Sequence, residues 1–313
     1  GTETTDFLLP YAVLSQSNVA DVVALGTSAG AMTLMPALKM LLPDTLAAFE
    51  VRHPDGADYV VVPAMHVSDN PQILAFVKEQ HLKGATIVGI CSGVKILSNA
   101  GLLRDRRATG HWFDADGLRK DNPGMQWVAD RRYVVDRGVV TTTGITASMP
   151  VSLALVEAMA GPERAAALAA QLGVPGWDAQ HDSAAFGLTA RLAWTLATNK
   201  LAVWGQEDIA LPLEAGMDDA ALALAADAYS RTYRSQAVTT SNSRAPVRTR
   251  SGLLVVPDRI SAAGDGAWKV TQPPRPLQVL DAALQDISQR YGERTAEWVA
   301  TQMEYPHVRG GGK

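Results

Sequence analysis

The residues best suited to chemistry lie in Gly89-Ile90-Cys91-Ser92-Gly93, which contains the only cysteine of the chain. An apolar stretch precedes this segment and a helical pattern follows it, so the cysteine stands at a tight bend between strand and helix. Such a bend is the thiol counterpart of the nucleophile elbow, which presents a side chain above the edge of a sheet. Helix N–H groups at the bend would lower the pKa of the thiol and face a developing oxyanion. The alternative is that Cys91 is a small buried hydrophobe, as free cysteines often are.

Two other segments contain catalytic residue types. Ser28 lies in Gly26-Thr27-Ser28-Ala29-Gly30, which fits the pattern of a serine nucleophile, but the following residues 31–35 predict a strand where the elbow needs a helix. His181, Asp182 and Ser183 are the residue types of a triad, but sequence neighbours do not easily face one another in triad geometry. We therefore expect Ser28 not to be a nucleophile and residues 181–183 to form a loop.

The composition is that of a globular protein, with 313 residues, 47% hydrophobic and 19% charged, and a net charge of -4. This charge gives no electrostatic case for binding nucleic acid. A single cysteine rules out an intrachain disulfide and a cysteine-rich zinc site, and the six histidines show no ligand spacing, so no metal is expected. No apolar run is long enough to cross a membrane, so this chain is expected to be soluble. Its compartment stays open, as does any anchor or export signal upstream of Gly1.

Short apolar runs alternate with helical stretches, the pattern of a mainly parallel sheet covered by helices. The expected strands are residues 20–25, 59–63 and 86–90, with a later hairpin of 133–135 and 138–142. The expected helices are residues 71–81, 94–103 and 150–160. This order predicts a three-layer α/β domain over residues 1–187.

Residues 188–313 predict a second unit that is an abbreviated, degenerate repeat of the first. Gly216 to Ser230 aligns with Gly1 to Ser15 without a gap, Val255-Val256-Pro257-Asp258 echoes Leu41-Leu42-Pro43-Asp44, and residues 279–303 echo residues 151–172. The order of the matching segments carries the argument, because each match alone is weak. The middle section with the cysteine elbow is missing from the copy. An apolar strand within residues 200–213 precedes the helix at Gly216, so we expect a matching strand upstream of Gly1.

The motifs together resemble the ThiJ/PfpI superfamily, which has the flavodoxin-like, class I glutamine amidotransferase-like fold. The segments that carry the resemblance are Gly89 to Gly93, Ala100-Gly101-Leu102-Leu103, Arg107 to Trp112, and Thr142-Thr143-Gly144-Ile145-Thr146-Ala147. Within the superfamily the chain looks most similar to the isocyanide hydratase branch and to the sensor domains of some AraC-type regulators.

The resemblance implies that Cys91 pairs with a carboxylate on the first helix, four residues before a proline, and Asp6 before Pro10 fits that pattern. A neutral carboxyl in a desolvated site can donate a hydrogen bond to a thiolate. The alternative is that Asp6 is a solvated helix cap.

The resemblance also implies a pocket around the elbow. The backbone N–H groups of Ser92 and Ala64 are the expected oxyanion donors, and Gly89 lies at the base of the elbow. Met65, where the family often has glycine, would narrow the pocket. His111 is a further candidate for the pocket, although a structural role beside Trp112 is favoured.

The chain departs from other branches of the superfamily. Ser92 replaces the histidine that follows the cysteine in the protease-like branch, the place near Met125 lacks the histidine of the glyoxal-directed branch, and no His-x-Glu pair follows Thr143. Protease, deglycase and amidotransferase activities therefore lose their usual base.

We expect a cofactor-free, cysteine-dependent hydratase or hydrolase, a lyase-type enzyme that acts on a small electrophilic molecule, with Cys91 as nucleophile and Asp6 as proton partner. The alternative is a non-catalytic ligand-sensing or scaffold protein, since Ala221 occupies the position of Asp6 in the second unit. No basic helix-turn-helix pattern follows, which disfavours an AraC-type regulator. Because family members commonly dimerise, the expected assembly is a homodimer or an intrachain pseudo-dimer in which the second unit replaces a partner.

Overall fold

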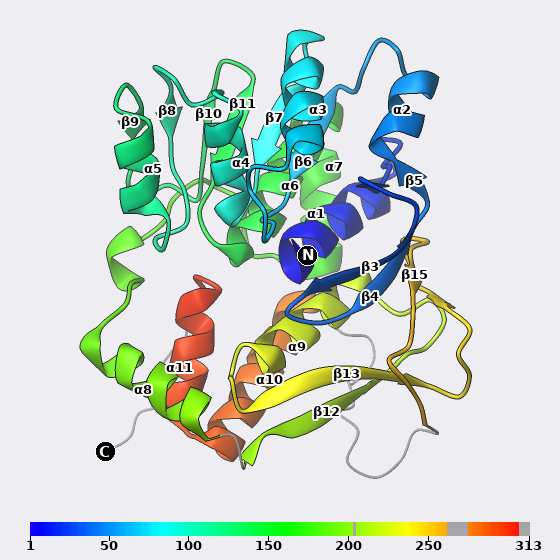
Figure 1. Cartoon of the computed structure of the whole chain (residues 1–313), viewed down its shortest axis with the longest axis vertical. Helices are drawn as coiled ribbons and strands as arrows, with labels where there is room; N and C mark the ends of the chain where they lie inside the picture. The colour runs from blue at the N-terminus through cyan, green and yellow to red at the C-terminus, as the bar shows by residue number, and fades with distance from the viewer. Residues whose placement is uncertain (203–204, 262–274, 307–313) are drawn as a thin grey trace.

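The computed structural model describes residues 1–202, 205–261 and 275–306. A four-stranded sheet in the order β10-β11-β7-β6 forms the centre of the first half (Figure 1). Its strands are β6 (Tyr59–Val62), β7 (Thr86–Gly89), β10 (Tyr133–Asp136) and β11 (Val139–Thr142). The strands β6, β7 and β11 run parallel, and β10 closes the sheet as an antiparallel hairpin partner of β11. These four strands confirm the strands predicted from the apolar segments. The segments are rich in the β-branched residues that favour strands.

The first half contains five helices besides two nearer its start. They are α3 (Pro71–Leu82), α4 (Val94–Asn99), α5 (Ala115–Asp121), α6 (Ser148–Ala160) and α7 (Pro162–Leu172). Of these, α3, α4 and α6 lie close to the three predicted helices, whereas α5 and α7 were not predicted. The side chain of Asn70 caps α3 by accepting from the N–H groups of Gln72 and Ile73, with Pro71 at the first helical position. The helix α4 is shorter than the predicted 94–103 because the chain turns at Gly101, where φ is +76°.

The predicted strand at residues 20–25 is wrong for all but its last residue. Only β2 (Leu25–Gly26) is a strand, paired with β5 (Asp44–Thr45), and residues 21–24 form no ladder. The apolar pattern there is that of a strand, but a ladder needs a neighbouring strand that donates and accepts hydrogen bonds.

A second sheet joins the two halves of the chain, in the order β1-β3-β4-β15-β14. Its strands are β1 (Thr2–Glu3), β3 (Gly30–Met35), β4 (Lys39–Leu42), β14 (Val247–Arg248) and β15 (Leu254–Val255). The strand β15 pairs antiparallel with β4, with Leu254 opposite Leu41.

The second half contains a smaller parallel sheet in the order β12-β13-β16. Its strands are β12 (Glu207–Pro212), β13 (Ser235–Ser241) and β16 (Arg259–Ile260). Its helices are α8 (Ala190–Leu201), α9 (Asp219–Ser230), α10 (Pro276–Tyr291) and α11 (Glu293–Gln302). The remaining short elements of the first half are α2 (Leu46–Arg52), β8 (Arg107–Ala108) and β9 (Gln126–Trp127).

The helix α1 (Thr4–Ser17) lies against α9 at the centre of the molecule (Figure 1). The largest buried cluster contains Leu9 of α1, Val156 of α6, Ala223 of α9 and Leu284 of α10, so the two halves share this core. None of the helices in the described part of the chain is both long and apolar enough to cross a membrane.

Candidate functional site

Cys91 lies at a sharp bend between β7 and α4, as the sequence predicts. Its φ is +54°, a left-handed conformation that a residue other than glycine adopts only where the surroundings impose it. A Cβ atom on Gly93 would lie 2.2 Å from the carbonyl oxygen of Val62, so only glycine allows the bend to approach β6 this closely. The N–H of Cys91 donates to Thr142 Oγ1 of β11 at 3.0 Å, which fixes the bend to the sheet.

Gly89 lies at the base of the bend rather than in an open pocket. A Cβ atom on this residue would lie 2.9 Å from Leu97 Cδ2, so glycine lets the first turns of the helix pack onto the strand. Gly89 therefore lies at the elbow as expected, and it contributes by letting Leu97 pack closely against the strand.

The electrostatic surroundings of Cys91 are the reverse of what the elbow pattern predicts. The residue is buried, and burial is the main reason that the pKa of its thiol lies well above the ordinary value. The charges of Asp6, Glu3 and Glu304 raise the pKa further, while the Ser92 N–H lowers it. The thiol is therefore neutral at rest, because burial and, after it, the neighbouring carboxylates outweigh the N–H groups of the bend.

Asp6 is fully buried near Cys91 and is not a solvated cap. The cap of α1 is Glu3, whose side chain accepts from the Asp6 N–H at 2.6 Å. Burial raises the pKa of the Asp6 carboxyl to about 7, against lowering effects of the Ala64 N–H and Arg231. Its Oδ2 accepts from Ala64 N–H at 3.2 Å, while Oδ1 has no hydrogen-bond partner among the described residues. The free oxygen can take a proton.

The predicted oxyanion donors behave differently from one another. The Ala64 N–H donates to Asp6, so it does not point at an open oxyanion position. The Ser92 N–H acts on the thiol, and the Ser92 hydroxyl donates to Asp114, which also pairs with Lys95 at 3.4 Å. Met65 forms a bridge with Thr2 and lines a groove along β6 that Asp6 also lines, while Cys91 is not among the residues lining that groove.

The sequence does not predict the buried charge cluster beside Asp6, because its residues come from two helices that are far apart in the chain. Arg231, at the end of α9, pairs with Glu3 at 2.6 Å and with Asp227 at 2.6 Å. The Thr5 hydroxyl donates to Asp227 Oδ2 at 2.8 Å. The only available signal is the Asp-to-Arg spacing of four residues on α9, which predicts an ion pair and not a partner 228 residues away.

Glu304 from the end of the chain approaches the same site. It accepts from Gly144 N–H at 2.8 Å and pairs with His181 Nε2 at 3.1 Å, while His111 Nε2 lies 3.8 Å away. Burial raises the pKa of Glu304, but His181, His111 and the Gly144 N–H together hold it below the ordinary value. Gly144 is needed here, because a Cβ atom would lie 2.7 Å from the Glu304 side chain.

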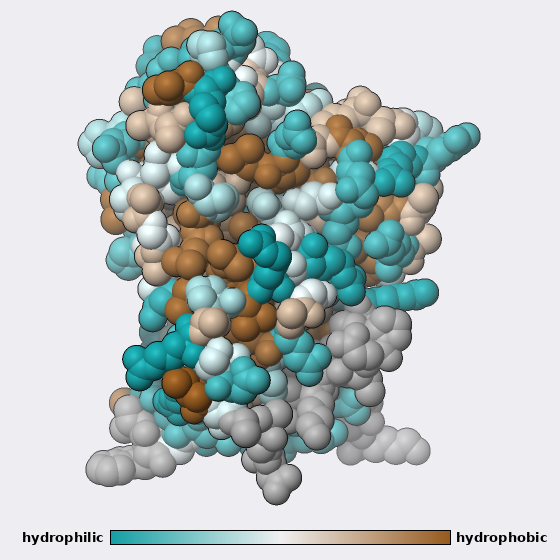
Figure 2. Space-filling view, turned by 90° about the vertical axis from the view of Figure 1, so that its right-hand side faces the viewer, coloured by the Kyte–Doolittle hydropathy of each residue, from teal (hydrophilic) through white to brown (hydrophobic). Residues whose placement is uncertain are grey.

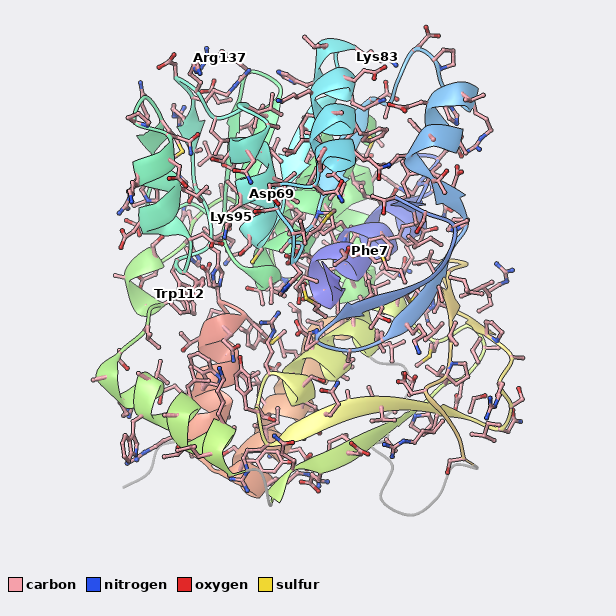
Figure 3. All side chains as sticks on the ribbon, viewed as in Figure 1. Phe7, Asp69, Lys83, Lys95, Trp112 and Arg137 are labelled. Atoms are coloured by element: carbon pink, nitrogen blue, oxygen red, sulfur yellow. The ribbon has the colours of Figure 1, made fainter. Side chains whose placement is uncertain are left out.

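His111 has structural contacts, in line with the favoured expectation. Its Nε2 donates to the carbonyl of Gln302 at 3.1 Å, and burial lowers its pKa, so the ring is neutral. Trp112 packs on it with the ring centroids 5.1 Å apart and donates from Nε1 to the Thr301 carbonyl at 3.1 Å. Figure 3 shows Trp112 beside the upper end of α11, where the two halves meet. His181 lies in the predicted loop, yet it reaches Glu304, which the sequence did not indicate.

Residues 1–158 match the model of the DJ-1/PfpI family. The transcriptional regulator CdhR of Pseudomonas aeruginosa is 32% identical over 101 residues, which cover 32% of this chain and 30% of that protein. The isonitrile hydratase of Pseudomonas putida is 34% identical over 104 residues, which cover 33% of this chain and 44% of that protein. The chain thus spans less than half the length of these two relatives.

A solved structure of a ThiJ/PfpI family protein from Pseudomonas syringae has the same fold over part of this chain. The TM-score is 0.51 at 23% identity, over 56% of this chain and 72% of that one. The family match, the elbow geometry and this likeness agree with the expected superfamily. The chain belongs to the DJ-1/PfpI family.

Proposed function

We propose that the protein is a cofactor-free, cysteine-dependent enzyme in which Cys91 attacks a small electrophilic carbon and Asp6 moves the proton. The observation that carries this proposal is the burial of an elbow thiol next to a carboxyl with one unpartnered oxygen. The name of the isonitrile hydratase among its relatives supports an isocyanide as the first substrate class to test.

The raised pKa values assign the resting protonation states. The Cys91 thiol stays protonated, and Asp6, with a pKa of about 7, is partly ionised at neutral pH. Asp6 therefore acts as a general base during attack, when its free oxygen takes the thiol proton. No standing thiolate is required.

With an isocyanide, the sulfur forms a bond to the terminal carbon and Asp6 returns the proton to that carbon, which gives a thioimidate. Water then adds across the carbon–nitrogen double bond, with its oxygen on the carbon and one of its protons on the nitrogen. The carbon–sulfur bond breaks, and the second proton of the water reaches the thiol through Asp6. The product is an N-substituted formamide, so water is consumed and the enzyme is unchanged. The Ser92 N–H is a backbone hydrogen-bond donor to the sulfur.

The decisive variants are Cys91→Ala and, as a matched control, Ser28→Ala, since Ser28 is exposed and lies outside the site. Turnover of an aliphatic isocyanide, followed by formamide formation, should vanish in Cys91→Ala and persist in Ser28→Ala. Circular dichroism of both variants checks that the fold survives. Full activity of Cys91→Ala would end the proposal.

A ligand-sensing role is the second candidate. Two observations favour it: the neutral resting thiol and the use of the Ala64 N–H by Asp6 instead of an oxyanion. The similarity to the regulator CdhR is compatible with sensing. Tight binding of an isocyanide or glyoxal to the native protein without any turnover would favour this role.

We also propose that residues 188–313 are a degenerate repeat of the layered domain 1–187 and act as a built-in partner. When Gly216 is aligned with Gly1, matching residues contact each other reciprocally, as in a two-fold interface. Glu3 pairs with Arg231 at 2.6 Å, and the matching pair, Asp218 with Gln16, lies at 3.4 Å. A monomeric mass in solution is the expected result, and a dimer formed through α1 would contradict it.

A further inference from the structure

The carboxylate of Glu304 is held by donors of the first half. The Trp112 N–H donates to its Oε1 at 3.2 Å, and the Gly144 N–H donates to its Oε2 at 2.8 Å. His181 Nε2 lies 3.1 Å from the same Oε2. The side chain of Glu304 is only 3% exposed, so these contacts replace the water that a carboxylate would otherwise bind. The three donors therefore form a carboxylate-binding site.

One of these donors leaves the central sheet at the same edge as Cys91. Gly144 follows β11 and Cys91 follows β7, and the two strands are parallel neighbours with Thr141 opposite Gly89. Ligands of parallel sheets bind at the carboxyl ends of the strands, where such loops meet. The charge of Glu304 raises the pKa of the Cys91 thiol, as a carboxylate close to the sulfur does. The carboxylate site therefore adjoins the thiol.

The backbone of Glu304 has a conformation that its surroundings impose. Its φ is +50°, in the left-handed region that residues other than glycine seldom adopt. Its carbonyl accepts from Thr146 Oγ1 at 2.8 Å, and the Met303 carbonyl accepts from the Thr146 N–H at 3.2 Å. The chain is thus strained at the residue whose carboxylate meets the donors, and this strain lowers the cost of moving the carboxylate out.

Space for a displaced Glu304 side chain lies beside His181. A pocket of about 650 Å³ is lined by His181 and by Tyr305 and Pro306, which directly follow Glu304. Arg132 also lines this pocket, and its guanidinium has no ion pair within the described part of the chain. A carboxylate that moved into the pocket would therefore meet a cation.

The groove along β6 offers different chemistry. Asp6 lines this groove, but the three donors that hold Glu304 do not. Figure 2 shows apolar side chains gathered in the middle of the face that looks to the right in Figure 1. Glu304 follows α11, which lies left of the centre in Figure 1. A ligand with a carboxylate fits the donors around Glu304 rather than that apolar face.

We propose that the three donors form a carboxylate subsite beside Cys91, which Glu304 fills at rest and which the carboxylate of a substrate fills in its place. The inference deepens the proposed function and rests on it for Cys91 as the reacting group. It narrows the substrate class to a small electrophile that carries a carboxylate, such as an isocyanide with a carboxylate group. Charge-assisted hydrogen bonds from the donors would fix the position of such a ligand.

The test compares two reagents that alkylate the single cysteine with loss of iodide. Iodoacetate carries a carboxylate and iodoacetamide carries a neutral amide of nearly the same size, so the ratio of their rate constants reports binding of the carboxylate. Glu304→Gly empties the subsite without backbone strain, because glycine tolerates the left-handed φ. Glu304→Gln is the matched control, since it also removes the negative charge but keeps the subsite filled.

In Glu304→Gly, the ratio of the iodoacetate to the iodoacetamide rate constant should be at least about tenfold higher than in the native protein, because the emptied donors hold the carboxylate. In Glu304→Gln, the ratio should stay within about threefold of the native value, the effect of removing one nearby charge. Sodium acetate should slow the iodoacetate reaction of Glu304→Gly more than sodium chloride does at the same concentration, because acetate occupies the subsite.

Equal ratios in the two variants would overturn the proposal, because the lost negative charge would then explain the whole effect. A native ratio in Glu304→Gly would also overturn it, since the donors would then be only a structural anchor for Glu304. If circular dichroism shows Glu304→Gly to be unfolded, recovery of the fold in sodium acetate but not in sodium chloride would support the subsite, and failure to recover would overturn it.

These measurements need no turnover, so the subsite and the proposed function can fail separately. Full activity of Cys91→Ala would end the proposed function, whereas the alkylation ratio reports the subsite whether or not the protein catalyses a reaction.

Discussion

The starts of α1 and α9 are matching helix ends with different chemistry. Both begin with an acidic cap: Glu3 accepts from Asp6 N–H at 2.6 Å, and Asp218 accepts from Ala221 N–H at 3.0 Å. Both caps also pair with an arginine. Three residues after the cap, the first helix carries Asp6 near a thiol, and the second carries Ala221. The acidic cap stabilises the helix start in both halves. The proposed chemistry depends on the Asp6 carboxyl and the Cys91 bend, which only the first half has.

The largest effect should come from removing that carboxyl. Asp6→Asn cannot accept the thiol proton, so the rate of isocyanide turnover should fall by about 100- to 10,000-fold. The matched control is Asp219→Asn, in the first turn of α9, which should keep turnover within about twofold of the native rate. Equal turnover in native protein and Asp6→Asn would show that α1 carries no catalytic carboxyl and does not differ from α9 in this respect.

The arginines that pair with the two caps should differ in their contribution to stability. Arg231→Met leaves Glu3 and Asp227 without their cation in a buried place, so the free energy of unfolding should fall by about 3–5 kcal/mol. The Arg250 side chain is 45% exposed, so Arg250→Met should cost less than about 1 kcal/mol. Urea unfolding of both variants measures the difference. Equal costs would mean that the cluster near Cys91 depends on its arginine no more than Asp218 depends on the half-exposed Arg250.

Asp6 should also leave a signature in the pH dependence of stability. Its folded pKa of about 7 lies above that of an unfolded aspartate, so the folded state binds the extra proton and native stability falls as pH rises from about 4 to about 7. Asp6→Asn removes this loss, so the variant should gain stability relative to the native protein over that range. Thermal unfolding from pH 4 to pH 8 tests this, with the exposed Asp55→Asn as control. A constant difference between native protein and Asp6→Asn would contradict the raised pKa.

The smallest effect concerns the cap of the second half. Asp218→Ala should lower the free energy of unfolding by about 0.5–2 kcal/mol, because one first-turn N–H of α9 loses its acceptor. Turnover should stay within about twofold of the native rate, since Asp218 lies at the end of α9 remote from Arg231 and Cys91. A large loss of activity would show that the second helix start takes part in the chemistry.

The parts of the fold that depend on local pattern could be predicted. The strands β6 and β7, the β10–β11 hairpin and the Cys91 bend follow from apolar runs and from glycines at fixed positions. The conformation of residues 20–25 could not be predicted in this way, because an apolar segment forms a strand only where a neighbouring strand pairs with it. The pairing of Cys91 with Asp6 came from a resemblance to known motifs, and its catalytic role stays a prediction.

The electrostatics of the site could not be predicted, because they depend on contacts between residues far apart in the chain. Arg231 and Glu304 reach the first half from the second, and nothing near either residue in the sequence indicates this. The predicted lowering of the Cys91 pKa was wrong, because the thiol is buried and because Asp6, Glu3 and Glu304 converge on it from separate elements.

The most direct test of the central claim is the rate of Cys91 alkylation by iodoacetamide as a function of pH, in the native protein and in Asp6→Asn. The single cysteine makes the signal unambiguous. If Asp6 serves as the base for the thiol, the native rate should rise through about pH 7, as Asp6 ionises, and this rise should be absent from Asp6→Asn. A rate that rises only near the ordinary thiol pKa of about 8.5, and equally in both proteins, would contradict the account.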